Sequence, residues 1–194
     1  MISFVRISVV LLLLFAIPLP VNSSGCNPFG INLHDLQGKT VSIKPGSGHQ
    51  ATAFVFLMAD CPACQTYSLT LNNLDKKYKA AGIRFIGVVP GNYSTPAEIA
   101  EFMHTYKISF PVFTDPTNAL VKCLHATIVP EVFLVGSEGQ TLYSGRIDDW
   151  MAALGKKKPA IHTHDLQDAI AAVVNHQPVK VKHTKAIGCF IEID

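Results

Sequence analysis

The chain has 194 residues, of which 48% are hydrophobic and 15% are charged. This composition suits one globular domain with a sizeable core and excludes a disordered protein. The formal charge of +2 comes from dispersed lysines and arginines, and the one short basic run, GKKKP at 155–159, is interpreted as a solvated loop. The sequence therefore offers no nucleic-acid surface, and we expect no nucleic-acid partner.

The N-terminus reads as a secretory signal peptide. Arg6 is the only charge before an almost wholly apolar run over residues 7–17, and small residues follow it. The run is shorter than the ~20 residues that span a bilayer, so we expect residues 1–25 to be removed. Lipidation of Cys26 is a weaker alternative, because Ser23 stands where lipoprotein signals usually carry leucine. The prediction is an exported protein, periplasmic or secreted, in a compartment where disulfides persist.

The remaining chain alternates predicted strands with predicted helices. The apolar run at 51–59 is typical of a strand buried on both faces, and a capping box of Thr95 and Glu98 with Pro96 between them marks a helix start. In chain order we expect a hairpin within 26–47, a strand at 51–59, a helix closing near Gly82, a strand at 83–90, a helix from 96, a strand at 110–115, a short helix at 117–126, hairpin strands at 131–135 and 140–145, and a helix at 165–175. This order predicts an α/β sheet with helices on both faces.

Two cysteines, Cys61 and Cys64, lie between the buried strand and the helix that follows it. A cysteine at the amino end of a helix has its thiolate favoured by the unpaired N–H groups and the helix dipole. Pro62 suits the first helical turn, and the spacing places Cys64 one turn deeper. The pattern predicts Cys61 as a nucleophile and Cys64 as the thiol that resolves a mixed disulfide formed on it.

Two other interpretations of this pair stay open at this point. A permanent structural disulfide is one, although so short a loop gains little stability in the chain-entropy model. Half of a metal site is the other. The residue before the pair, Asp60, has two interpretations: its carboxylate opposes thiolate formation on Cys61, or it is a helix-entry residue that interacts with the dipole.

Over roughly residues 29–194 the sequence resembles the thioredoxin-fold redoxins, the alkyl hydroperoxide reductase/thiol-specific antioxidant superfamily. The segments that carry the resemblance are LQGKTVSI, DCPAC, TIVPEVFLV, GRIDD and GCFI. The resemblance implies a thioredoxin-like α/β fold, a central mixed sheet flanked by helices, with an N-terminal hairpin extension. We expect the mature chain to consist of a redoxin domain at 26–178 and a C-terminal tail with Cys189 at 179–194. The resemblance also implies that Pro130 is cis and lies against Cys61.

The function that follows is an exported thiol-disulfide oxidoreductase acting on protein disulfides or dithiols. Its redox-active disulfide would join Cys61 to Cys64, and substrates would dock against Pro62 and the Val129–Pro130 loop. We expect no bound cofactor, a membrane-linked redox partner and a monomer. Asp60 tilts the expected direction towards reduction.

A thiol peroxidase-like redoxin and a copper-binding thioredoxin-fold carrier are the alternative functions. Peroxiredoxins carry a threonine three residues before the attacking cysteine, where this chain has Met58. Soft thiolates with imidazole suit copper, which favours the copper carrier. The spacing argues against it, because copper carriers of this fold usually space their cysteines by three residues rather than two. The histidines weighed as ligands are His104, His125, His162, His164, His176 and His183. We expect none of them to be a ligand, and no metal site.

Three cysteines remain outside the pair. Cys123 is expected to be a small buried hydrophobe on the short helix. Cys189 lies in the tail after Gly188, and one hypothesis joins it to Cys26, stapling the tail to the N-terminal hairpin. A free thiol or a third redox-active cysteine are the alternatives for Cys189.

Overall fold

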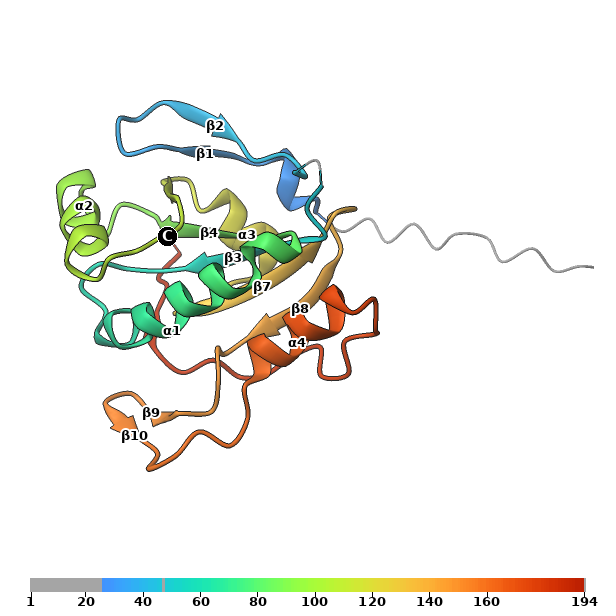
Figure 1. Ribbon diagram of the computed structural model, residues 1–194. Helices are drawn as coiled ribbons and strands as arrows, with labels where there is room; N and C mark the ends of the chain where they lie inside the picture. Colours follow the sequence, from blue (N-terminus) through green and yellow to red (C-terminus); the bar gives the residue numbers. More distant parts are fainter. Residues whose placement is uncertain (1–25, 47, 194) are drawn as a thin grey trace, which may run out of the picture.

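The structure is a computed structural model that describes residues 26–46 and 48–193. The predicted signal peptide, residues 1–25, lies outside the described residues. Figure 1 shows one central sheet with helices on both sides and the N-terminal hairpin along one edge. This arrangement confirms the predicted mixed sheet, the flanking helices and the hairpin extension.

The elements follow the predicted order closely. The strands of the main sheet are β1 (Asn32–His34), β2 (Thr40–Ser42), β3 (Ala51–Phe56), β4 (Ile83–Pro90), β5 (Val112–Asp115), β7 (Glu131–Gly136) and β8 (Thr141–Gly145). The helices are α1 (Pro62–Tyr78), α2 (Pro96–Thr105), α3 (Ala119–Leu124) and α4 (Asp165–Val174), with 3₁₀ turns η1 (Pro28–Gly30) and η2 (Lys79–Ala81). Two short strands, β6 (Ile128–Val129) and β11 (Cys189–Phe190), pair with each other outside the main sheet.

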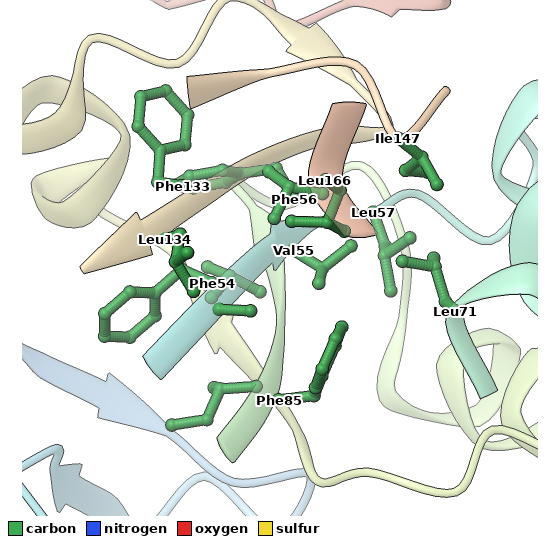
Figure 2. Packing of buried hydrophobic residues seen from close by; sticks show 14 of the residues in the cluster. Phe54, Val55, Phe56, Leu57, Leu71, Phe85, Phe133, Leu134, Ile147 and Leu166 are labelled. Atoms are coloured by element: carbon green, nitrogen blue, oxygen red, sulfur yellow. The ribbon is translucent and has the colours of Figure 1, made fainter. Parts of the chain in front are cut away.

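The sheet order is β2-β1-β5-β4-β3-β7-β8, with β3 parallel to β4 and antiparallel to β7. All six residues of β3 are buried, because helices cover both faces of this central strand. Figure 2 shows Leu71 of α1 and Leu166 of α4 packed near Val55 and Leu57, which point to one face. Phe54 points to the opposite face. The continuous apolar run of the sequence is thus the central strand of the core.

The predicted helix ends are present. Thr95 accepts from the Glu98 N–H through its hydroxyl, and the Glu98 carboxylate accepts from the Thr95 N–H at 2.7 Å. Gly82 follows α1 and η2 with a φ of 79°, a left-handed conformation that favours glycine. The carboxylate of the buried Asp115 accepts from three successive N–H groups at the start of α3, at 2.8–3.0 Å.

The basic run at 155–159 differs from its predicted state. Lys156–Lys157 form a short strand, β10, which pairs with β9 (Met151–Ala153) in a small hairpin. Both lysines are exposed, as a solvated loop would have them, and the Lys157 ammonium lies 4.4 Å from the centre of the Trp150 ring. Strands of two residues leave no periodic pattern in a sequence, so the prediction missed them.

The C-terminal tail packs along the sheet edge rather than standing free. The Ser144 N–H of β8 donates to the Lys182 carbonyl, and the Thr184 N–H donates to the Ser144 carbonyl. The tail then reaches β6 through β11, and Figure 1 shows it running past the start of α1. Within the described part of the chain, no helix has the length and apolarity needed to cross a bilayer.

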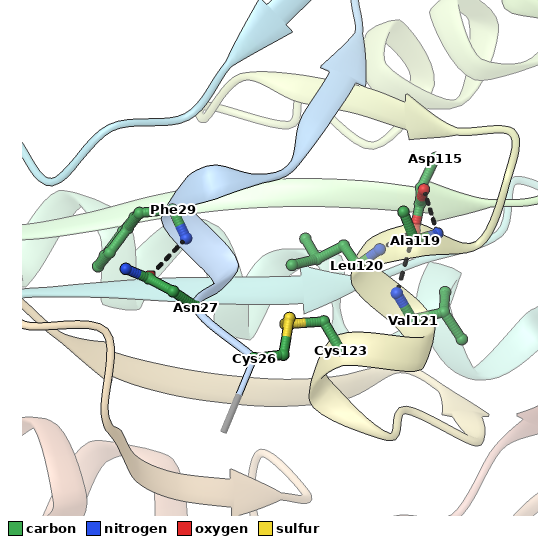
Figure 3. Close-up of a disulfide and its surroundings, with 8 residues drawn as sticks. All are labelled: Cys26, Asn27, Phe29, Asp115, Ala119, Leu120, Val121 and Cys123. Atoms are coloured by element: carbon green, nitrogen blue, oxygen red, sulfur yellow. Dashed lines mark hydrogen bonds between the residues drawn. A yellow bond between two sulfur atoms is a disulfide. The ribbon is translucent and has the colours of Figure 1, made fainter. Parts of the chain in front are cut away.

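The segment before η1 is tied to α3 by a disulfide between Cys26 and Cys123, whose Cα atoms are 5.3 Å apart. Figure 3 shows this bond between the segment before η1 and the short helix. The predicted Cys26–Cys189 bond is therefore wrong, and so is the interpretation of Cys123 as a small buried hydrophobe. The reason is spatial: η1 packs against α3, whereas the tail ends beside β6.

We predict that the double variant Cys26→Ala/Cys123→Ala has a free energy of unfolding about 2–4 kcal/mol lower than the wild type, because the bond joins residues separated by 97 positions and its loss frees the unfolded chain. Urea denaturation of both proteins without reductant measures this difference. An unchanged midpoint would contradict a stabilising role for the bond.

Candidate functional site

Cys61 is the N-cap residue of α1, directly before Pro62. Its backbone is extended, and its carbonyl accepts from the Gln65 N–H at 3.1 Å, the first hydrogen bond of the helix. The Cys61 side chain makes no capping hydrogen bond. The unpaired N–H groups of the first turn and the helix dipole therefore favour negative charge on this sulfur whenever it is reduced.

The loop before β7 faces Cys61. The Val129–Pro130 peptide bond is cis, as the resemblance implied, and the Cys61 Sγ lies 3.4 Å from the Val129 carbonyl oxygen. Both loop residues are buried. The predicted approach of the Pro130 loop to Cys61 is thus present in the structure, and its role in docking substrates stays a prediction.

Glu131, directly after the cis bond, is buried and hydrogen-bonded to the backbone of the same loop. Its side chain is only 6% exposed, and its carboxylate accepts from the Thr127 N–H at 3.0 Å. Burial raises the pKa of Glu131, while the N–H groups of Thr127 and Ile128 act in the opposite direction. The sequence analysis missed this residue, although a carboxylate at the start of a buried strand was the available signal.

Cys64 lies one turn into α1 and is fully buried. It is the one cysteine of the chain outside a disulfide, and its sulfur accepts from the Met58 N–H at 3.5 Å. The pKa of the Cys64 thiol is raised to about 12, chiefly by burial and to a smaller extent by the Asp60 carboxylate, against the opposing effect of the Met58 N–H. Cys64 is therefore a protonated thiol at neutral pH in this state.

Cys61 is bonded to Cys189 of the tail, with 6.2 Å between their Cα atoms. The structure thus does not contain the predicted Cys61–Cys64 disulfide. The physical reason is the pairing of β11 with β6: Cys189 lies opposite Val129, the residue that the Cys61 sulfur contacts. The redox role of Cys61 and Cys64 stays a prediction, and Cys189 joins them at the site.

Asp60 is exposed and lies at the rim of a cleft of about 310 Å³. Gln65 of α1 lines one side, and Glu98, Glu101 and Phe102 of α2 line the other. Asp60, which directly precedes Cys61, and the two glutamates make this cleft acidic. The Asp60 carboxylate acts electrostatically on Cys64, whereas its effect on the Cys61 thiolate stays a prediction.

The two aspartates of the GRIDD segment are structural. Asp148 accepts from the Tyr67 hydroxyl at 2.7 Å and so links α1 to the chain after β8. Asp149 accepts from the Lys158 ammonium at 2.7 Å, and this contact, with two backbone N–H groups, lowers the pKa of Asp149. Tyr67 and Asp148 line a very small cavity that Pro130 also borders, so they support the loop from behind.

Metal ligands do not gather around the pair. Across residues 26–46 and 48–193, no three side chains of histidine, cysteine, aspartate or glutamate are placed to hold one ion. The cysteine sulfurs face a backbone carbonyl, a backbone N–H and another cysteine.

The chain matches the Redoxin family over residues 19–174. It belongs to the Redoxin family. The matched region ends before the C-terminal tail, so Cys189 lies beyond it. The described fold and the cis Pro130 loop are those that the sequence resemblance implied for this redoxin.

The chain also resembles individual proteins, both in sequence and in structure. The redoxin is 26% identical over 108 residues to the thiol-disulfide oxidoreductase ResA of Bacillus thuringiensis, a stretch of 56% of this chain and 61% of ResA. The chain thus spans about three fifths of the length of the first curated relatives that it matches.

Among solved structures, a hypothetical protein from Sinorhizobium meliloti superposes with a TM-score of 0.75 at 23% identity, covering 86% of this chain and 92% of that protein. A secreted disulfide oxidoreductase of Mycobacterium tuberculosis, homologous to E. coli DsbE, superposes with a TM-score of 0.55 at 14% identity, covering 75% and 97%. At these identities the likeness shows a shared thioredoxin-like fold.

We predict that Cys64 is the single titratable thiol of the protein in its Cys61–Cys189 form and that iodoacetamide modifies it slowly. A pKa of about 12 leaves Cys64 mostly protonated, so near pH 8 its thiolate fraction is about a thousandfold below that of an unfolded cysteine. Alkylation followed by mass spectrometry, with and without guanidinium, gives both rates. A native rate equal to the denatured one would contradict the burial of Cys64.

Proposed function

We propose that this redoxin is an exported thiol-disulfide oxidoreductase that exchanges disulfides with protein substrates through Cys61 and Cys64. The observation that carries the proposal is the position of the Cys61 sulfur, at the start of α1 and 3.4 Å from the carbonyl of the Val129–Pro130 loop. Cys64, a buried thiol one turn further along the same helix, is placed to resolve what forms on Cys61. Membership of the Redoxin family and the likeness to ResA support it.

The exchange has two balanced steps. The Cys61 thiolate attacks a substrate disulfide, forming a Cys61–substrate bond and releasing one substrate sulfur as a thiolate, which takes up a proton. Cys64 then loses its proton and attacks the Cys61 sulfur, forming the Cys61–Cys64 disulfide and releasing the second substrate thiol. The substrate is reduced by two electrons, and the protein is oxidised by two. A membrane-linked redox partner would return the electrons.

Substrates would dock on the backbone of β6. Val129 is buried, so its side chain is not the contact. The contact would be the backbone edge of β6, which the tail strand β11 covers in the structure and which a substrate would have to take over. Such an edge binds an extended peptide by main-chain hydrogen bonds. Pro62, which is exposed beside Cys61, would contribute an apolar contact to the docked segment.

Reduction of substrates is the direction that the charges favour. The exposed carboxylate of Asp60 lies next to Cys61 in the sequence and acts electrostatically on Cys64. A negative charge disfavours a thiolate and thereby disfavours the reduced form of the pair, which makes the dithiol a better electron donor.

Export is supported by the chemistry of the cysteines. Four of the five cysteines are in disulfides, which persist outside the cytosol. The Cys26–Cys123 bond supports a mature protein in which the Cys26 sulfur carries no lipid thioether. We therefore propose that signal cleavage near residue 25 releases a monomeric protein with no lipid anchor, in keeping with the secreted structural neighbour.

The test is the reduction of insulin disulfides by dithiothreitol, with and without the redoxin, after treatment of the protein with a metal chelator. We expect the wild type to accelerate reduction, Cys61→Ser to abolish the acceleration, and Cys64→Ser/Cys189→Ser to accumulate a Cys61–insulin mixed disulfide detectable by mass spectrometry. The matched control is Cys26→Ser/Cys123→Ser, whose two positions lie away from the site. This variant should accelerate the reduction of insulin as the wild type does. A wild type without acceleration, or with thiols blocked by copper before chelation, overturns the proposal.

Asp60→Asn is predicted to make the protein a weaker reductant. Removal of the negative charge beside the cysteine pair stabilises the thiolate form, so the reduction potential rises by about 10–30 mV, a change of up to about tenfold in the equilibrium with glutathione. Titration in glutathione buffers, with thiols trapped by a maleimide, measures the shift. Glu98→Gln, which removes a charge further along the same cleft, is the control and should shift the potential less. A lower potential for Asp60→Asn would contradict the assignment.

A further inference from the structure

The tail lies on the site as a docked peptide would. Cys189 and Phe190 pair antiparallel with Val129 and Ile128, and the Ile191 N–H donates to the Thr127 carbonyl at 2.9 Å. Further along, the Tyr93 hydroxyl donates to the Glu192 carbonyl. The tail thus adds one extended strand to the edge of β6, which is the general mode in which sheets bind peptides.

Gly188 permits the close approach of the two backbones. A Cβ atom at this position would stand 1.9 Å from the Val129 carbonyl oxygen and 2.7 Å from the carbonyl carbon. Both obstacles are backbone atoms, which have no room to move without shifting the Pro130 loop. The residue before the docked cysteine is therefore restricted to glycine in this geometry.

The side chains of the tail alternate as in a strand with one buried face. Phe190 is 76% exposed, whereas Ile191 is 8% exposed and packs against the core. Ile187, on the other side of Gly188, borders the small cavity next to Pro130. The segment bound at the site therefore has the form Gly-Cys-X-apolar, in which the side chain at X faces solvent.

The Cys61–Cys189 bond is chemically a mixed disulfide within one chain. We propose that the tail is a built-in substrate: Cys189 is a third redox cysteine, and the site takes client segments that resemble the tail, extended and with glycine before the cysteine and an apolar residue two positions after it. This inference rests on the proposed function. It adds the class of segment recognised and the competition between the client and the tail.

The intramolecular exchange balances without any oxidant or reductant. Cys64 loses its proton, and its sulfur attacks the Cys61 sulfur; the Cys61–Cys64 bond forms as the Cys61–Cys189 bond breaks. The bonding electron pair leaves on the Cys189 sulfur, which takes up a proton. Cys61, Cys64 and Cys189 together stay oxidised by two electrons throughout. Because burial raises the pKa of Cys64, this exchange is slow at neutral pH while the tail is closed.

The closed tail holds Cys61 away from solvent. Cys61 is only 1% exposed in the structure, and a client has to replace a strand that is tethered to the same chain. A tethered segment has a high effective concentration at its site, so only clients that dock well compete with it. Opening of the tail exposes Cys61 and the edge of β6 together.

The first test measures capture of peptides by Cys61. The full-length Cys64→Ser/Cys189→Ser variant, reduced, is mixed with an eight-residue peptide of the tail sequence AIGCFIEI whose cysteine is joined to glutathione. A second peptide carries alanine for the glycine, a third carries aspartate for the isoleucine after phenylalanine, and glutathione disulfide is the small-molecule probe. We expect the tail peptide to be captured at least about tenfold faster than either altered peptide, because an added Cβ or a buried charge opposes docking.

The outcomes separate the two proposals. Equal capture of all three peptides, with glutathione disulfide reactive, overturns the tail as a substrate and leaves the oxidoreductase intact. No reaction of Cys61 with any probe, glutathione disulfide included, overturns the proposed function itself.

The second test maps the disulfides of the full chain. Oxidised wild-type protein is equilibrated with a trace of thiol, quenched in acid, blocked with a maleimide and digested. We expect both Cys61–Cys189 and Cys61–Cys64 peptides, with Cys26–Cys123 intact. Gly188→Ala should raise the ratio of Cys61–Cys64 to Cys61–Cys189 by at least about tenfold, because its Cβ displaces the tail.

Gly30→Ala is the matched control, since a Cβ at Gly30 meets nothing within 4 Å, and it should leave the ratio unchanged. Circular dichroism verifies that each variant is folded. Detection of Cys61–Cys189 alone at every stage of exchange, in wild type and Gly188→Ala alike, overturns Cys189 as a redox cysteine and makes the bond a structural staple. The peptide experiment does not depend on the folding of Gly188→Ala.

Discussion

The antiparallel register between β3 and β7 is the constraint on which the site depends. Phe56 at the end of β3 lies opposite Glu131 at the start of β7, so the chain leaving one strand meets the chain entering the other. Cys61 follows the first strand by a short turn, and Pro130 precedes the second by one residue. A slip of one residue would turn every buried side chain of β3 to the wrong face, so the core fixes this register strongly. The contact between the Cys61 sulfur and the Val129 carbonyl is a consequence of core packing.

The same register explains why three cysteines gather at one place. The turn after β3 brings Cys61, and the first turn of α1 buries Cys64 beneath it. The loop before β7 presents a short free edge, and the tail covers it with Cys189. The Cys61 sulfur is bonded to Cys189, a half-buried residue on a strand held mainly by backbone hydrogen bonds, and the buried Cys64 thiol lies one turn along α1. In the exchange that we propose, the tail strand leaves and the helix stays in place.

Most of the fold could be predicted from the sequence because its signals are local or strongly periodic. The apolar run of β3, the capping box of Thr95 and Glu98, and the glycine after α1 each leave a pattern within a few residues. The place of Cys61 at the start of α1 and the cis Pro130 followed from the motif and the resemblance, whereas the predicted Cys61–Cys64 disulfide is not in the structure. The small hairpin of β9 and β10 and the pairing of β6 with β11 did not, since two-residue strands carry no periodicity.

The disulfide pairing could not be predicted for a different reason: it depends on which distant segments the fold brings together. Five cysteines allow many pairings, and the predicted bond between Cys26 and Cys189 assumed that the two ends of the chain meet. Instead η1 packs against α3, and the tail continues past β8 to the far end of the sheet, beside α1. The two bonds differ in position. The Cys26–Cys123 bond joins the segment before η1 to α3, whereas the Cys61–Cys189 bond lies at the start of α1 and holds the strand that covers β6. The fold thus separates a bond that stabilises the chain from a bond placed where exchange is expected.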